Sequence, residues 1–205
     1  MIITADGKPS QQVTAAAATA NMVLGVIKRN MANFNDKMAK IIYPAFIRPH
    51  LEFASSVWNP STQGDISKLE RVQHRATNAN NLKHLSYDQR LQHFGFTTLK
   101  DRRLRGDLIQ TYKIINRLDR ITLVNQPTAW DEREGIATRS RVDRVNIERE
   151  LTKSKPRSNF LLNRVATAWN RLPTSVVNAP SVEAFKAGID KTARQQTLRF
   201  SIYQT

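Results

Sequence analysis

Apolar residues recur at steps of three and four along most of this chain, and this spacing constrains the fold more than any other feature. Between residues 10 and 30 the apolar positions are Val13, Ala17, Ala20, Leu24 and Ile27. Between residues 99 and 116 they are Leu104, Leu108, Tyr112 and Ile115. Such steps place side chains on one side of an α-helix. The sequence therefore predicts a mainly α-helical protein built as a helical bundle.

Residues that begin and end helices predict the individual elements. Helix-start residues stand before the periodic segments at Ser10, Asp36, Asp65, Ser86, Thr98 and Ser181. Ser86 followed by Gln89 forms a capping box, and Gly95 stands where a left-handed residue ends a helix. The second helix is expected to bury Met38, Ile41, Ile42, Ala45 and Phe46, with Pro44 and Pro49 kinking or splitting it. In the third, Ile66, Leu69 and Val72 are expected inside.

Helical periodicity fades from about residue 119 to residue 156, and it returns in "NFLLNRVATAWNRL", residues 159–172. The intervening part is expected to be an irregular basic loop or a weak β-hairpin. We divide the chain into residues 1–80, which are helical, 81–120, which are connecting helices, 121–158, the basic loop, and 159–205, a C-terminal helical region.

The chain is strongly basic, with 32 Lys and Arg against 17 Asp and Glu and a net charge of +15. Residues 1–60 carry 6 basic and 3 acidic groups, residues 61–120 carry 12 and 6, and residues 121–205 carry 14 and 8. The excess is spread through the chain and is not a detachable tail. A folded domain this positive repels itself unless a polyanion is near, and nucleic acid is the usual one. An acidic protein or a lipid surface is the alternative partner.

Several classes of protein are not expected. The chain has no cysteine, which excludes disulfides, thiolate catalysis, zinc fingers and iron–sulfur centres and suits an intracellular, reducing compartment, in the nucleus or the cytoplasm. The N-terminal residues lack the apolar core of a signal peptide. The most apolar window, residues 13–27, is too short to span a bilayer. No cofactor, metal site or membrane partner is expected.

Three groups of cations are candidates for phosphate contact. The tightest lies in "DRRLRGDLIQTYKIIN", where at least two of three arginines are expected to project outward: Arg102, Arg103 and Arg105. The second is a row at steps of three and four on the third helix: Lys68, Arg71 and Arg75. The third lies in the irregular basic segment: Arg139, Arg141, Arg144, Lys153, Lys155 and Arg157. Lys28 and Arg29 are interpreted as cations favoured by the end of the first helix.

Other chemistry-bearing residues favour structural roles. The histidines at 50, 74, 84 and 93 lack metal-ligand spacing. Asp107 is expected to pair with a nearby arginine, and no serine has the partners of a catalytic triad. Trp169 is expected in the core and Trp130 at the surface.

Five segments in order resemble the region downstream of the reverse-transcriptase palm in non-LTR (LINE-type) retrotransposon polyproteins of the jockey and chicken-repeat group. They are "ANMVLGVIKRN", residues 20–30; "RPHLEF" with "WNP", within 48–60; "ISKLERVQHRAT", 66–77; the stretch 82–116; and "NFLLNRVATAWNRLPTSVVNAPSVEAFKAGID", 159–190. The resemblance implies that residues 1–80 form a polymerase thumb, the element that holds the template–primer duplex. It implies that the rest is a C-terminal domain that helps to hold RNA or DNA.

Polymerisation needs two metal-binding aspartates, one of them in a Tyr-x-Asp-Asp type of turn, and the chain has no such motif. No endonuclease constellation is present either. We therefore expect a non-enzymatic module that binds RNA or an RNA–DNA duplex through non-specific phosphate contacts. The alternative is a domesticated structural or interaction subunit of a larger assembly, such as a ribonucleoprotein. A third reading is an open reading frame left by an inactive element.

Overall fold

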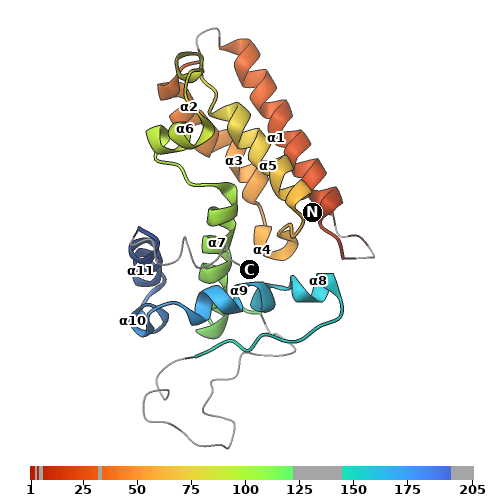
Figure 1. The fold of residues 1–205 in the computed structure, drawn as a ribbon, viewed down its shortest axis with the longest axis vertical. Helices are drawn as coiled ribbons and strands as arrows, with labels where there is room; N and C mark the ends of the chain where they lie inside the picture. Colours follow the sequence, from red (N-terminus) through yellow and green to blue (C-terminus); the bar gives the residue numbers. More distant parts are fainter. Residues whose placement is uncertain (3, 5–6, 32–33, 122–144, 195–205) are drawn as a thin grey trace, which may run out of the picture. The chain divides into compact units, whose positions relative to one another are not determined.

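The computed structural model describes residues 1–2, 4, 7–31, 34–121 and 145–194. No strand occurs among these residues, and the mainly helical fold expected from the spacing is confirmed (Figure 1). The elements are α1 (Ser10–Asn30), α2 (Asp36–Ile42), the π-helical η1 (Tyr43–Ile47), α3 (Arg48–Glu52), α4 (Ser55–Trp58), α5 (Gln63–Ala76), the 3₁₀ turn η2 (Asn80–Leu82), α6 (Tyr87–Phe94), α7 (Leu99–Ile115), α8 (Lys155–Ser158), α9 (Leu161–Asn170), α10 (Thr174–Val177) and α11 (Val182–Arg194).

The packing divides the chain into two compact units. Their boundary lies between Arg103 and Leu104, inside α7. The segment 81–120 of our sequence division is therefore shared between the two units. Each unit has its own cluster of buried apolar side chains.

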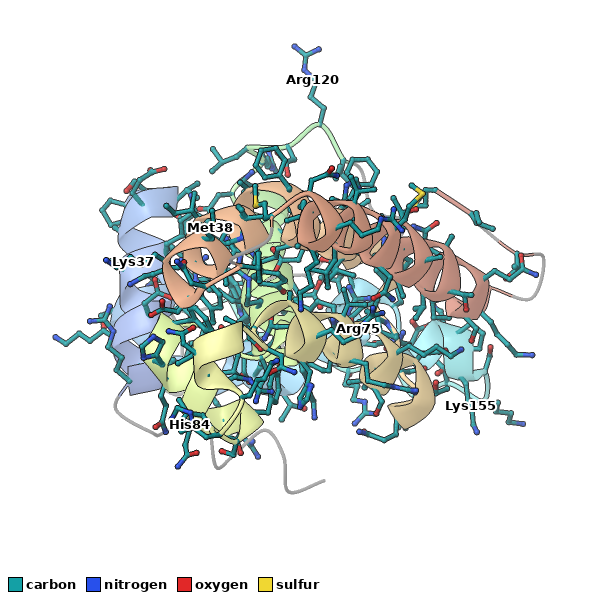
Figure 2. The ribbon with its side chains drawn as sticks, turned by 90° about the horizontal axis from the view of Figure 1, so that it is seen from above. Lys37, Met38, Arg75, His84, Arg120 and Lys155 are labelled. Carbon is teal, nitrogen blue, oxygen red and sulfur yellow. The ribbon has the colours of Figure 1, made fainter. Side chains whose placement is uncertain are left out.

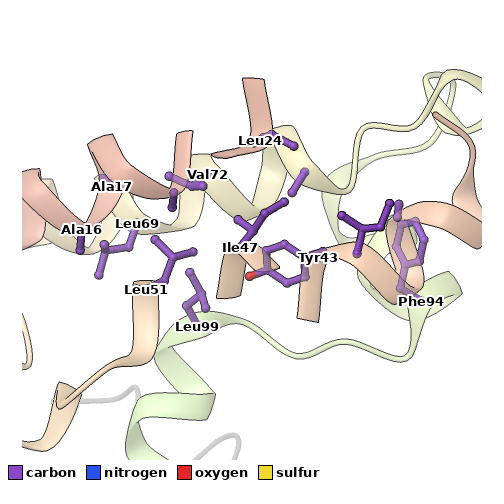
Figure 3. Packing of buried hydrophobic residues seen from close by; sticks show 14 of the residues in the cluster. Ala16, Ala17, Leu24, Tyr43, Ile47, Leu51, Leu69, Val72, Phe94 and Leu99 are labelled. Carbon is purple, nitrogen blue, oxygen red and sulfur yellow. The ribbon is translucent and has the colours of Figure 1, made fainter. Parts of the chain in front are cut away.

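The first unit is organised by α1, which packs along α5 and against α3 (Figure 1). The alanines of α1 face this contact: Ala16, Ala17 and Ala20 are buried, and Figure 3 shows the first two beside Leu69 of α5. Small side chains let the two helices approach closely. On α5 itself, Leu69 and Val72 are buried as the spacing predicts.

A buried glutamine ties four segments of this unit together. Gln73 on α5 is fully buried. The Gln73 Oε1 accepts from the Tyr43 hydroxyl at 2.6 Å. The Gln73 Nε2 donates to the Tyr87 hydroxyl at 2.9 Å and to the Thr97 carbonyl at 3.0 Å. Burial raises the pKa of Tyr43 and of Tyr87 far above the usual range, so both hydroxyls stay protonated. The Tyr87 hydroxyl in turn donates to Glu70 at 2.9 Å.

The buried face of α2 and the elements after it differs from the prediction. Ile42 is buried, but Met38, Ile41, Ala45 and Phe46 are exposed. Within α2 the buried side chains are Ala39 and Ile42, which leaves Met38 and Ile41 on the outer side. The buried side continues at steps of four through Tyr43, Ile47 and Leu51, so Ala45 and Phe46 also lie outside.

Three predicted helix caps also differ. Helix α1 begins at Ser10 after Pro9, and no side chain caps it. Asn35, not Asp36, caps α2 by accepting from the Met38 amide at 3.0 Å. Thr62, not Asp65, caps α5.

The remaining caps are confirmed. The capping box of Ser86 and Gln89 begins α6, and Gly95 ends it with a φ of 67°. The Thr98 hydroxyl accepts from the Asp101 amide at 3.1 Å, and the Ser181 hydroxyl accepts from the Ala184 amide at 3.1 Å.

The second unit is built around stacked aromatic rings. Trp169 and Phe185 are fully buried, and the ring centroids of Tyr112 and Phe185 are 4.3 Å apart. The Tyr112 hydroxyl donates to the Ala179 carbonyl at 2.6 Å. Trp169 is therefore a core residue, as expected. Leu108 and Tyr112 of α7 belong to the same core.

Asparagine side chains on α9 hold the chain that precedes it. Asn170 bonds the Ile147 amide at 3.0 Å and its carbonyl at 2.9 Å. Asn163 accepts from the Glu150 amide at 3.0 Å and donates to the Arg157 carbonyl at 2.9 Å. Within residues 145–158 the structure has α8 and no strand, which corrects the hairpin interpretation for that part. Residues 122–144, the rest of the predicted basic loop, lie outside the described residues.

Candidate nucleic-acid interface

A row of cations follows the outer side of α5. Lys68, Arg71 and Arg75 are all exposed, as the steps of three and four predict, because Leu69, Val72 and Ala76 occupy the buried side. Lys68 pairs with Asp65 at 3.0 Å. Arg71 and Arg75 bond only neutral oxygens in the described contacts, Arg71 the Ser67 carbonyl at 3.3 Å and Arg75 the Asn21 side chain at 2.7 Å. Figure 2 shows Arg75 on α5 beside α1.

A fourth cation reaches the end of this row from α1. The Lys28 ammonium donates to the Arg75 carbonyl at 2.8 Å and to the Asn78 carbonyl at 3.4 Å. These carbonyls lie at the C-terminal end of α5, where the helix dipole favours a cation. Lys28 also stands 5.3 Å from the centre of the Phe34 ring.

The pKa of Lys28 reflects a local excess of positive charge. Burial lowers its pKa, and the neighbouring charges of Arg75 and Lys83 lower it further. Lys83 is exposed. We call Lys28, Lys68, Arg71, Arg75 and Lys83 the α5 patch. Among the described residues, only Lys68 of this patch has a carboxylate partner.

The α5 patch can donate hydrogen bonds to a row of phosphates. Arginine and lysine contacts to phosphate fix a protein on the backbone and carry no sequence information. A helix row at steps of three and four suits a repeating array of charges. The chemistry available here is thus non-specific binding of a polyanion.

The arginines of α7 were the first candidate on sequence, and the structure shows that Arg102 and Arg105 each form an ion pair within the chain. Arg102 donates through both Nε and an Nη to the Glu52 carboxylate, and this hydrogen bonding raises the pKa of Arg102. Arg105 forms the same fork with Asp190, at 2.7 and 3.0 Å. The fork from Arg105 lowers the pKa of Asp190. Both guanidinium groups already hold an internal anion.

Arg102 and Arg105 are partly exposed, but Arg103 does not project outward, because only 2% of it is exposed. A buried guanidinium cannot reach a phosphate chain without a rearrangement of the helix. The three arginines are adjacent in sequence, but they serve separate internal contacts. This is a structural role that the sequence spacing alone did not reveal.

Asp107 pairs with an arginine, as expected, but not with one nearby in sequence. Arg164 on α9 donates to both Asp107 oxygens at 2.8 Å. The Arg164 side chain is 12% exposed and that of Asp107 is 2% exposed. Both members of this ion pair are thus largely shielded from solvent.

The third group of candidate cations is only partly described. Arg139, Arg141 and Arg144 lie outside the described residues. Lys153, Lys155 and Arg157 are exposed, and Figure 2 shows Lys155 at the start of α8. Arg157 pairs with Glu150 at 2.9 Å and lies 5.5 Å from the Phe160 ring centre.

His74 and His93 form contacts within the fold, whereas His50 and His84 are exposed. His93 bonds Asp36 at 3.0 Å, and this bond lowers the pKa of Asp36. His74 contacts the Arg90 guanidinium at 3.0 Å; burial first, and then Arg90, lowers its pKa. The described residues contain no group of three potential metal ligands. Trp58 is buried, and Trp130 lies outside the described residues.

Sequence reasoning missed two members of the α5 patch. Lys28 was assigned to the end of its own helix, where it does lie, but its ammonium also reaches the end of α5, 47 residues away in sequence. Lys83 follows η2 and was in no candidate group. Only tertiary packing brings these two cations to Arg75.

Comparison of the chain with protein-family models, with curated proteins and with solved structures found no match. None of the described helices has the length and apolar character needed to cross a membrane.

Proposed function

We propose that this chain is a non-catalytic nucleic-acid-binding module that holds RNA or an RNA–DNA duplex through phosphate contacts made by the α5 patch. The observation that carries the proposal is the gathering of Lys28, Arg75 and Lys83: burial, and then the charges of Arg75 and Lys83, lower the pKa of Lys28, and no carboxylate is described beside it. A bound phosphate relieves this repulsion. The net charge of +15 adds a long-range attraction for polyanions.

The resemblance to the thumb and C-terminal part of non-LTR retrotransposon reverse transcriptases agrees with this role. A thumb helix holds a duplex without contributing catalytic groups. We propose that α1 and α5 form the holding surface of such a thumb. The chemistry of the α5 patch supports binding to the sugar–phosphate backbone and not the recognition of bases.

The test is the salt dependence of binding to labelled RNA duplex, RNA–DNA duplex and single-stranded RNA, measured by fluorescence anisotropy. Contacts from about five cations predict a slope of about −4 in log K against log salt for duplex. Affinity should fall about a hundred- to a thousand-fold between about 50 and about 200 mM salt. Two duplexes of unrelated sequence should bind equally. Binding that is insensitive to salt, or confined to one sequence, would contradict the proposal.

A further inference from the structure

The helices that follow α1 carry an exposed apolar stripe. Its members are large side chains that a folded chain normally covers. The exposed fractions are 36% for Met38, 70% for Ile41, 59% for Phe46 and 69% for Phe53. Val57, on α4 just beyond, is 63% exposed. We call Met38, Ile41, Phe46 and Phe53 the α2–α3 stripe.

The stripe runs along one side of a continuous helical rod. Met38 and Ile41 are three residues apart, which is one α-helical turn. Ile41 and Phe46 are five apart, and the π turn η1 between them keeps residues at this spacing aligned. Phe46 lies in η1, and Phe53 directly follows α3, seven residues further along the chain. The core side of the same rod is filled separately by Ile42, Ile47 and Leu51.

Positive charge borders the stripe. Lys37 and Lys40 are both exposed on α2, and Figure 2 shows Lys37 next to Met38. The acidic groups of the rod are already engaged: Asp36 with His93 at 3.0 Å, and Glu52 with Arg102. In the described contacts neither lysine has a carboxylate partner. The surface is thus apolar along its centre and cationic at its edge.

We propose that the α2–α3 stripe is the docking surface for an amphipathic helix of a partner protein whose apolar face is bordered by Asp and Glu. Helices bind in this way through anchors spaced at three, four and seven residues. The acidic border of the partner meets Lys37 and Lys40 and sets its orientation. This site is separate from the α5 patch and does not depend on nucleic-acid binding.

A second copy of this chain is a poor occupant. It would bring another net charge of +15 and another pair of stripe lysines to the contact. Monomeric proteins rarely expose contiguous apolar patches beyond a few hundred Å² without a partner. The partner that fits both the apolar centre and the cationic edge is acidic and helical.

The test uses the full chain and three synthetic peptides of equal length. The first forms an amphipathic helix with a leucine face bordered by glutamate. The second keeps that leucine face but replaces glutamate by lysine, and the third scrambles the first so that no face forms. Isothermal titration calorimetry at physiological salt should show binding of the first peptide, with the other two at least tenfold weaker. No binding of the first peptide, or equal binding of the scrambled one, would overturn the proposal.

Neutral variants separate the stripe from the general charge of the chain. The double variant Ile41→Gln, Phe46→Gln should bind the first peptide at least tenfold more weakly. The matched control Leu151→Gln alters a side chain that is 98% exposed outside the stripe, and it should bind like the wild type. Equal loss in both variants would overturn the proposal. So would sedimentation showing a wild-type dimer that the double variant abolishes, since the stripe would then belong to a second copy.

Discussion

Gly188 in α11 is the residue whose replacement the packing resists most clearly. A Cβ at this position would lie 2.9 Å from both methyl groups of Val176 on α10. Contacts this short force side chains or backbone to move. The glycine is therefore required by close approach and not by backbone conformation.

Gly188→Ala should lower the free energy of unfolding by about 1–3 kcal/mol, the usual range for overpacking. The matched test adds Val176→Ala, which removes both clashing methyl groups. The double variant should recover part of the loss in a thermal or urea unfolding experiment. The packing account of this site is wrong if Gly188→Ala alone leaves the free energy of unfolding unchanged. It is also wrong if adding Val176→Ala lowers that free energy further.

Asp65 links α1 to α5, and its pKa connects that contact to pH. Its oxygens accept from the Ser10 hydroxyl at 2.6 Å, the Thr62 hydroxyl at 3.0 Å and the Lys68 ammonium at 3.0 Å. Burial acts to raise the pKa of Asp65, but these three hydrogen bonds outweigh it and hold the pKa below the ordinary value. A depressed pKa adds stability above the unfolded value, about 3.9 for Asp, that is lost as pH falls through the folded value.

Asp65→Asn should therefore be less stable than the wild type at neutral pH, by about 1–3 kcal/mol for hydrogen bonds to a charged group. The difference should begin to shrink as pH falls below about 3.9, where the carboxylate of the unfolded chain takes up a proton, and it should be lost once pH falls through the lower folded pKa. Urea unfolding of both proteins at a series of pH values measures this difference in stability. A difference that stays constant from neutral to acidic pH contradicts the assigned role of this carboxylate.

At the scale of the elements, the ion pairs that α7 makes with α9 and with α11 differ in burial. This difference predicts unequal losses of stability when each pair is broken. Asp107→Ala leaves the buried Arg164 guanidinium without this carboxylate and should lower the free energy of unfolding by about 3–5 kcal/mol. Breaking the half-exposed pair by Asp190→Ala should cost about 1 kcal/mol or less. Hydrogen-exchange mass spectrometry should show faster exchange in α7 and α9 for the first variant. Similar destabilisation by both variants would contradict this ranking of burial.

Sequence predicted the helices well and their contacts poorly, for reasons that particular elements show. The start and stop of α6 follow from local chemistry at Ser86, Gln89 and Gly95, which tertiary packing did not change. The stretch 38–46 is apolar on both sides, so periodicity assigned Met38, Ile41 and Phe46 to the core, whereas tertiary packing buries Ala39 and Tyr43. The partner of Arg105 is 85 residues away, at Asp190, and no local pattern encodes such a pair.

The candidate site shows the same division between local and distant information. Lys68, Arg71 and Arg75 were found because their spacing on one helix is local. Their neighbours Lys28 and Lys83 were missed because packing brings them there. The carboxylates that pair with Arg102 and Arg105 come from distant elements, so the sequence pattern did not reveal these ion pairs.

At the scale of the whole molecule, the 32 Lys and Arg side chains are not equivalent. Part of this positive charge is neutralised by ion pairs with Glu52, Asp107 and Asp190. Another part is gathered in the α5 patch, where repulsion between cations favours an anionic partner. The central claim is that this second part, and not the arginines of α7, binds the phosphate chain.

One comparison tests that claim most directly: the slope of log K against log salt for RNA duplex binding by two variants. The α5 variant carries Lys68→Gln, Arg71→Gln and Arg75→Gln, and the α7 variant carries Arg102→Gln and Arg105→Gln, with folding of both checked by circular dichroism. The α5 variant should lose about 2–3 from the magnitude of the slope, at about 0.9 for each phosphate contact removed, while the α7 variant keeps the wild-type slope. A reduced slope for the α7 variant, with the α5 variant unchanged, would contradict the account.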